Sequence, residues 1–132
     1  IFLATGVRPS DMMERAGIPT GPDRAMVVNR YLQSEKYPEI FGGGDCIHFS
    51  EHPVDKVGVY AVRQNPVLLH NLEAALDGGD FQIFTPQESY LLIFNLGGKA
   101  GVFRKGKITF KGRPAFAIKD YIDRKFIKTF QE

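Results

Sequence analysis

Residues 40–45, Ile-Phe-Gly-Gly-Gly-Asp, determine how the rest of this chain is interpreted. A short apolar run ends there in three glycines and one carboxylate, Asp45. We expect residues 40–43 to form a buried strand, because a strand that stops on glycine and presents an acid is how an α/β sheet reaches a sugar hydroxyl. Glycine allows close approach to the backbone, and a carboxylate accepts a hydrogen bond from a sugar alcohol. The stretch therefore predicts a site for a dinucleotide cofactor.

Composition narrows the class of protein. The 132 residues suffice for one domain or two small ones. Hydrophobic residues make up 43% and charged residues 24%, which is ordinary for a globular protein, and no apolar run reaches the ~18 residues of a membrane-spanning helix. The single cysteine, Cys46, cannot form an internal disulfide and fits a reducing cytoplasm, where we expect the protein to be.

The beginning of the chain and its charge distribution suggest a larger context. The chain opens inside an apolar run, residues 1–4, without a methionine, so we interpret it as part of a longer polypeptide. Residues 99–132 hold ten Lys or Arg against three acids, whereas residues 1–98 hold seven against twelve. The two parts therefore face different partners, or each other.

Hydrophobic periodicity places elements on both sides of a boundary near Asp80, which predicts two domains, residues 1–80 and 81–132. Before the boundary we expect a strand end and turn at residues 3–6, a helix over 11–16 capped by Ser10, a strand over 26–28, a polar loop over 46–56, and a helix over 58–76 that Pro66 kinks or splits. The core face of the long helix is predicted to hold Val59, Val62, Leu68, Leu69, Leu72, Ala75 and Leu76.

Beyond the boundary the pattern changes to short strands. Residues 90–96, 100–104 and 107–110 are predicted strands, joined at Gly97-Gly98 and through Gly106. A last amphipathic helix is expected over residues 116–130. We expect its apolar face to cover the strands; this face holds Ile118, Tyr121, Ile122, Phe126 and Phe130. The fold class is thus α/β in the first domain and α+β in the second.

Three segments together resemble a family. Residues 4–9, Ala-Thr-Gly-Val-Arg-Pro, resemble the turn after the NAD(P)H-binding domain of the pyridine nucleotide-disulfide oxidoreductase superfamily. Residues 37–41, Tyr-Pro-Glu-Ile-Phe, leading to Gly44-Asp45, resemble its second FAD motif, and residues 58–64, Gly-Val-Tyr-Ala-Val-Arg-Gln, its following helix. Residues 84–87 and 118–124 are most similar to the branch of type II NADH dehydrogenases and sulfide:quinone reductases. The resemblance implies the C-terminal part of an FAD-binding sheet, followed by a small subdomain of strands and one helix.

The resemblance implies roles for particular residues. Asp45 is expected to bond the ribityl chain of FAD, with Gly44 giving the backbone clearance for it. The amides of Gly58 and Val59 are expected to approach the isoalloxazine, where a helix N-terminus stabilises the negative charge of reduced flavin. Some relatives carry Thr-Pro or Thr-Ala-Gln at this helix start, so backbone contacts carry over and side-chain contacts do not.

For the other polar residues the sequence supports a place in the cofactor site less strongly. In some relatives a C-terminal lysine lies near the flavin, which suggests the same place for Lys119, although a solvated surface lysine explains it as well. We interpret Cys46 as a small buried residue, His48 and His52 as loop residues, and His70 as a surface or boundary residue. Their spacing matches no zinc pattern, so no metal is predicted.

The resemblance implies that the whole protein passes hydride from NAD(P)H, bound upstream of this chain, to FAD, and electrons to an acceptor such as quinone. The partners are then FAD and the N-terminal remainder of the same polypeptide; a homodimer and contact of the basic final helix with a membrane surface remain open, and nucleic acid is not expected. The alternatives are a non-enzymatic interaction or dimerisation module, and a flavoprotein of the ferredoxin- or nitrite-reductase type.

Overall fold

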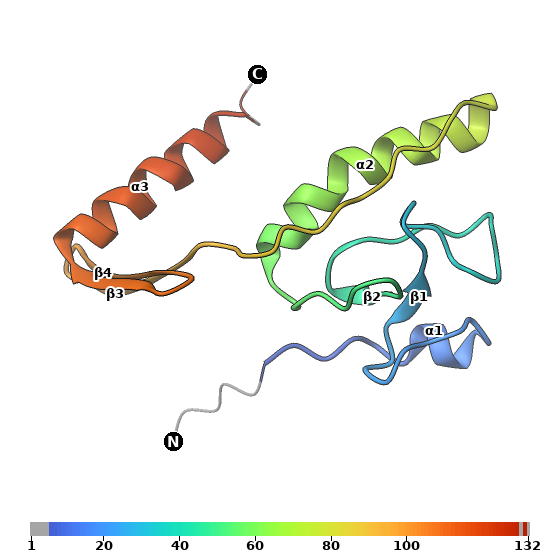
Figure 1. Cartoon of the computed structure of the whole chain (residues 1–132), viewed down its shortest axis with the longest axis horizontal. Helices are drawn as coiled ribbons and strands as arrows, with labels where there is room; N and C mark the ends of the chain where they lie inside the picture. Colours follow the sequence, from blue (N-terminus) through green and yellow to red (C-terminus); the bar gives the residue numbers. More distant parts are fainter. Residues whose placement is uncertain (1–5, 130, 132) are drawn as a thin grey trace. The chain divides into compact units, whose positions relative to one another are not determined.

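The protein folds into two compact units, Ile1–Pro86 and Gln87–Glu132, and each is described by itself. The structure is a computed structural model that describes residues 6–129 and 131 (Figure 1). The expectations for residues 1–5 and for Phe130 fall outside the described residues. One sheet is parallel and the other antiparallel, so the mixed α/β class expected from the sequence agrees with the structure.

Two short parallel strands form the centre of the first unit. Strand β1 (Met26–Val28), which was predicted, pairs with β2 (Ile47–Phe49), and every second residue of each strand is buried. The strand predicted over residues 40–43 is wrong. In its place, Phe41 forms a single isolated bridge with Gln33. The loop predicted over residues 46–56 is wrong at its beginning, where the strand Ile47–Phe49 lies, and is confirmed over residues 50–56.

Gly42 explains why the glycine stretch is packed into the core instead of extended along a sheet. A Cβ atom at Gly42 would lie 2.6 Å from Met26 Cε and 2.8 Å from Ile47 Cγ2. The chain therefore passes over the two strands in a place that has no room for a side chain. Helix α1 (Met12–Arg15), close to the helix predicted over 11–16, precedes these strands; its N-cap is Asp11, and the Ser10 hydroxyl accepts a hydrogen bond from the Met12 amide.

Helix α2 (Gly58–Asp77) confirms the predicted long helix, and Pro66 does not split it. Pro66 is exposed, so the carbonyl left without a helical donor can bond to water. The predicted core face is wrong. The buried side chains are Tyr60, Gln64, Val67, Asn71 and Ala74, whereas Val62, Leu69, Leu72 and Leu76 are exposed. Two amides on the buried face misled an interpretation based on hydrophobicity alone.

Asn71 ties α2 to two other parts of the first unit. Its Nδ2 donates to the carbonyls of Tyr31 at 2.8 Å and Gln82 at 2.9 Å, and its Oδ1 accepts from the Gln82 amide at 2.7 Å. Phe84 is buried against Phe49, with ring centroids 5.6 Å apart. The segment after α2 consequently runs back along the helix, and the first unit extends to Pro86, past Asp80 (Figure 1).

Lys56 fixes the segment that leads into α2. Its ammonium donates to the Ile47 carbonyl at 2.6 Å and pairs with Asp23 Oδ2 at 2.8 Å. Burial opposes ionisation of Asp23, but hydrogen bonds from Lys56 and the Ala25 amide, with the charges of Lys56 and His48, outweigh burial and lower the pKa of Asp23 below its ordinary 3.8. The beginning of the helix is thus held to the first residue of β2.

The second unit is a three-stranded antiparallel sheet with one helix. Strands β3 (Leu92–Gly97), β4 (Ala100–Lys105) and β5 (Ile108–Gly112) are paired in order, which confirms the predicted strands and turns. Helix α3 (Arg113–Lys128) begins before the predicted position. The helix packs closely on Gly101, which has no Cβ atom. A Cβ atom there would lie 3.0 Å from the Phe94 carbonyl oxygen and 3.2 Å from the Phe116 nitrogen.

The apolar face of α3 is mostly uncovered. Among the described residues of the helix only Ala115 is buried, and Tyr121, on the apolar face, is 68% exposed. Ile118, Ile122 and Phe126 are also more than one third exposed. The expectation that this face covers the strands therefore holds only in part, since each of its described apolar side chains remains more than one third exposed.

Replacing Asn71 with alanine tests the tie between α2 and its neighbours. The change leaves two carbonyls and one amide without their partner, and we expect the free energy of unfolding to fall by about 3 kcal/mol. Urea unfolding measures it, with Asn65→Ala, an exposed asparagine on the same helix, as the matched control. Equal stability of the two variants would contradict this role.

Asp23 predicts a pH dependence of stability. Because folding lowers the pKa of Asp23, its contribution is present above the unfolded-state value of 3.8 and is lost as the pH falls through the lower folded-state value. We expect Asp23→Asn to be less stable than the wild type at pH 7, and the difference to shrink below about pH 4. Thermal unfolding across this range checks it; a difference that grows on acidification would refute the assignment.

Candidate functional site

The turn that carries Asp45 is a short 3₁₀ helix, η1 (Gly44–Cys46), which lies against α2. Gly44 has φ +72, a conformation that favours glycine, whereas a Cβ atom there would lie 3.4 Å from Ala61 Cβ, an ordinary contact. Backbone conformation, more than space, thus requires glycine at position 44. The turn directs the chain from the glycine stretch into β2.

The Asp45 carboxylate is available to a ligand. Its side chain is partly exposed, and within the described part of the chain it makes no hydrogen bond or ion pair. A carboxylate accepts hydrogen bonds through two oxygens and donates none when ionised. Asp45 can therefore receive hydroxyl or amide donors from a bound molecule without breaking a contact within the fold.

The beginning of α2 is open next to this turn. The N-cap residue Val57 makes no side-chain hydrogen bond to the first turn, and a Cβ atom at Gly58 would meet nothing within 4 Å in the structure described. Helix geometry leaves the first amides, including those of Gly58 and Val59, without an acceptor inside the helix. The structure thus brings Gly44 and Asp45 to the first turns of the helix that Gly58 and Val59 begin.

Gln64, which the sequence interpretation overlooked, connects the turn to the helix. Its Oε1 accepts a hydrogen bond from the Gly44 amide at 2.6 Å, although Gln64 lies two turns into α2. Its Nε2 is buried and has no hydrogen-bond partner among the described residues. An unpaired buried donor costs about 1–3 kcal/mol. An apolar side chain at position 64 would therefore be more stable, unless the hydrogen bond to Gly44 offsets this cost.

A signal for Gln64 was present in the sequence. Tyr60, Gln64, Val67 and Asn71 follow one another at helical spacing, so two amides lie on one stripe with an aromatic and an aliphatic residue. Polar residues spaced in this way are candidates for buried hydrogen bonds to loops, and both amides make such bonds here. Lys56 was also missed, because nothing near it in the sequence indicates its partners.

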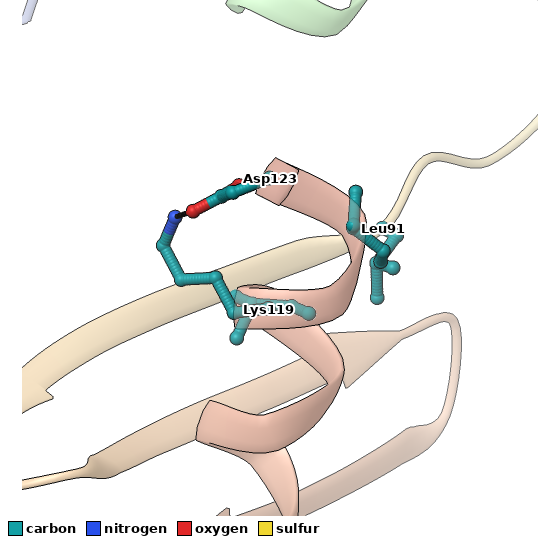
Figure 2. Close-up of a pocket in the computed structure, with 5 residues that line it drawn as sticks. Leu91, Lys119 and Asp123 are labelled. Carbon is teal, nitrogen blue, oxygen red and sulfur yellow. Dashed lines mark hydrogen bonds and ion pairs between the residues drawn. The ribbon is translucent and has the colours of Figure 1, made fainter. Parts of the chain in front are cut away.

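Lys119 lies in the second unit and is paired within its own helix. Its ammonium forms an ion pair with Asp123, and both line a hollow of about 140 Å³ with Leu91, Ile93 and Ile122 (Figure 2). This volume is below the roughly 300–1,000 Å³ of most small-molecule sites. The Asp123 carboxylate lowers the positive charge that Lys119 presents to a ligand.

The remaining candidates do not form a metal site. No group of three or more His, Cys, Asp or Glu residues in the described ranges is placed to hold a metal ion. Cys46 is exposed, not buried as expected, and its thiol donates to the Gly43 carbonyl. His48 was expected in a loop but lies in β2, with Nδ1 3.6 Å from Asp23 Oδ1. His70 is a surface residue, as expected.

Comparison with known proteins gives one match that covers this site. The family model for pyridine nucleotide-disulphide oxidoreductase matches residues 1–73, which include the Asp45 turn, the beginning of α2 and Gln64. No curated protein matches the chain. The matched residues are more than half of the chain. The chain belongs to the pyridine nucleotide-disulphide oxidoreductase family.

Proposed function

We propose that this chain contributes the ribityl and isoalloxazine side of the FAD site in an NAD(P)H oxidoreductase of the NADH dehydrogenase-like branch. The family is one of flavin-dependent oxidoreductases that typically bind FAD and NAD(P)H. The observation that carries the proposal is the Asp45 carboxylate, which has no partner within the described residues and lies in a turn packed against the open beginning of α2.

The residues present fit part of FAD. Asp45 would accept a hydrogen bond from a ribityl hydroxyl, and the amides of Gly58 and Val59 would face the pyrimidine end of the isoalloxazine. FAD, when bound, supplies the acceptor for hydride from NAD(P)H. The helix N-terminus favours the negative charge that the reduced flavin carries, so this chain's contribution is to orient the cofactor and stabilise that charge.

The other parts of the proposal concern groups outside this site. NAD(P)H is proposed to bind to residues that precede this chain in a longer polypeptide, and a quinone is the proposed electron acceptor. Lys119 remains a candidate for favouring reduced flavin, although its pairing with Asp123 makes it weaker than the Asp45 turn. The proposed location is the cytoplasm, including the cytoplasmic surface of a membrane.

Replacing Asp45 tests the flavin site in the full-length protein. We expect Asp45→Ala to raise the FAD dissociation constant about tenfold, because one charge-assisted hydrogen bond is lost, and Asp45→Asn to have a smaller effect. Flavin absorbance and fluorescence titration measure it, with Glu39→Ala, an exposed acid before the glycine stretch, as control. A wild-type protein that neither contains nor takes up FAD would exclude this function.

We also propose that α3 contacts an anionic membrane surface. The observation that favours it is the exposed Tyr121 and Phe126 beside Lys125, with Lys128 one turn on, on a helix whose apolar face remains partly exposed. Within the described residues no helix is long and apolar enough to cross a membrane. The contact would therefore be peripheral, with the rings and aliphatic side chains in the interface and the ammonium groups near lipid phosphates.

Sedimentation with vesicles tests this contact. We expect the full-length protein to bind vesicles of mixed phosphatidylserine and phosphatidylcholine, and the double change Lys125→Glu with Lys128→Glu to weaken binding about tenfold or more at low salt. The control, Lys107→Glu with Lys111→Glu, alters net charge equally but lies in and beside β5. If both variants bind alike, or the protein forms dimers through α3 and ignores vesicles, the proposal fails.

A further inference from the structure

Gln64 bonds one of the two glycines that precede Asp45 and lies close to the other. Besides its 2.6 Å bond from the Gly44 amide, a Cβ atom at Gly43 would lie 3.6 Å from Gln64 Oε1 and 3.7 Å from Gln64 Cβ. The residue is 1% exposed. One buried side chain of α2 thus bonds Gly44 and limits the space for a side chain at Gly43.

The orientation of the Gln64 amide follows from these contacts. The backbone N–H of Gly44 can only donate, so the atom that faces it must be the oxygen, and Nε2 is left as the buried donor without a partner in the described residues. The fold therefore tolerates an unsatisfied donor in order to place one acceptor against Gly44. Gly44 is also the residue with φ +72, where the chain turns toward Asp45.

We propose that Gln64 is a positioning residue: its hydrogen bond to Gly44 fixes the rotation of the turn and hence the direction of the Asp45 carboxylate. The expected effect of Gln64 on FAD binding rests on the proposed function, whereas its expected effect on the turn does not. Gln64 acts through Asp45 and need not touch the cofactor. Lys56 holds the other end of the turn through the Ile47 carbonyl, so the turn is fixed on both sides.

A double-mutant cycle in the full-length protein separates positioning from general stabilisation. We expect Gln64→Met, which removes the acceptor at similar volume, to raise the FAD dissociation constant about tenfold in the wild-type background. In an Asp45→Ala background the same change should add less than about twofold, because the carboxylate it positions is gone. Equal losses in both backgrounds would overturn the proposal.

Two further variants keep the result interpretable. Gln64→Glu retains an oxygen toward Gly44 but puts a buried carboxylate oxygen in place of the unpaired amide nitrogen, so it should lower stability, and its folded protein should keep FAD affinity within about threefold of wild type. Val67→Ala lowers stability from the same buried face and removes no hydrogen bond to Gly44, so its folded protein should bind FAD as the wild type does. A loss with Val67→Ala equal to that of Gln64→Met would show a general effect of stability.

A readout without flavin decides the positioning step if the proposed function fails. In the ligand-free protein, Gln64→Met should shift or broaden the amide NMR signals of Asp45 and Cys46 as well as Gly44, and Val67→Ala should leave the first two unchanged. If only the Gly44 signal moves, the turn does not depend on Gln64 and the inference is wrong. A wild-type protein that does not bind FAD would refute the proposed function without deciding this comparison.

Discussion

The hydrogen bond from the Gly44 amide to the buried Gln64 side chain is the interaction on which the candidate site depends. It joins the glycine stretch, residues 42–44, which has no side chains, to the buried face of a helix. Glycines cannot hold a turn through side-chain packing, since they have none. The helix supplies what the glycines lack, and Lys56 supplies a second attachment at the other end of the turn.

This arrangement explains how a site can be both open and ordered. The Asp45 carboxylate has no partner among the described residues, and a Cβ atom at Gly58 would meet nothing within 4 Å there, so both positions are open to a ligand. Their backbone, by contrast, is fixed from the buried side by Gln64 and by the strand β2. The polar groups that a cofactor would need are thus unpaired, while the backbone that carries them is held in place by hydrogen bonds.

The sequence predicted the elements with long or strongly punctuated patterns. The helix over 58–76 has enough residues to show its period, and the strands of the second unit are bounded by Gly97, Gly98 and Gly106.

The strand at Ile47–Phe49 was missed because three residues give too little alternation to detect among charged neighbours. The core face of α2 was misassigned because its buried stripe includes Gln64 and Asn71, which pack by hydrogen bonding and not by hydrophobicity. Asp45 could be selected from its context, whereas the helical spacing of Gln64 and Asn71 marks Gln64 only as a buried amide and does not identify its partner, a backbone amide twenty positions away.

Cys46 gives the site a property that its fold does not require. It is the single cysteine of the chain, it is exposed, and it directly follows Asp45, with its thiol against the Gly43 carbonyl. A thiol-specific label on this chain therefore attaches at one place, in the same 3₁₀ turn as the carboxylate. The chain contains its own attachment point for a spectroscopic probe, so events at the turn can be followed without introducing a cysteine.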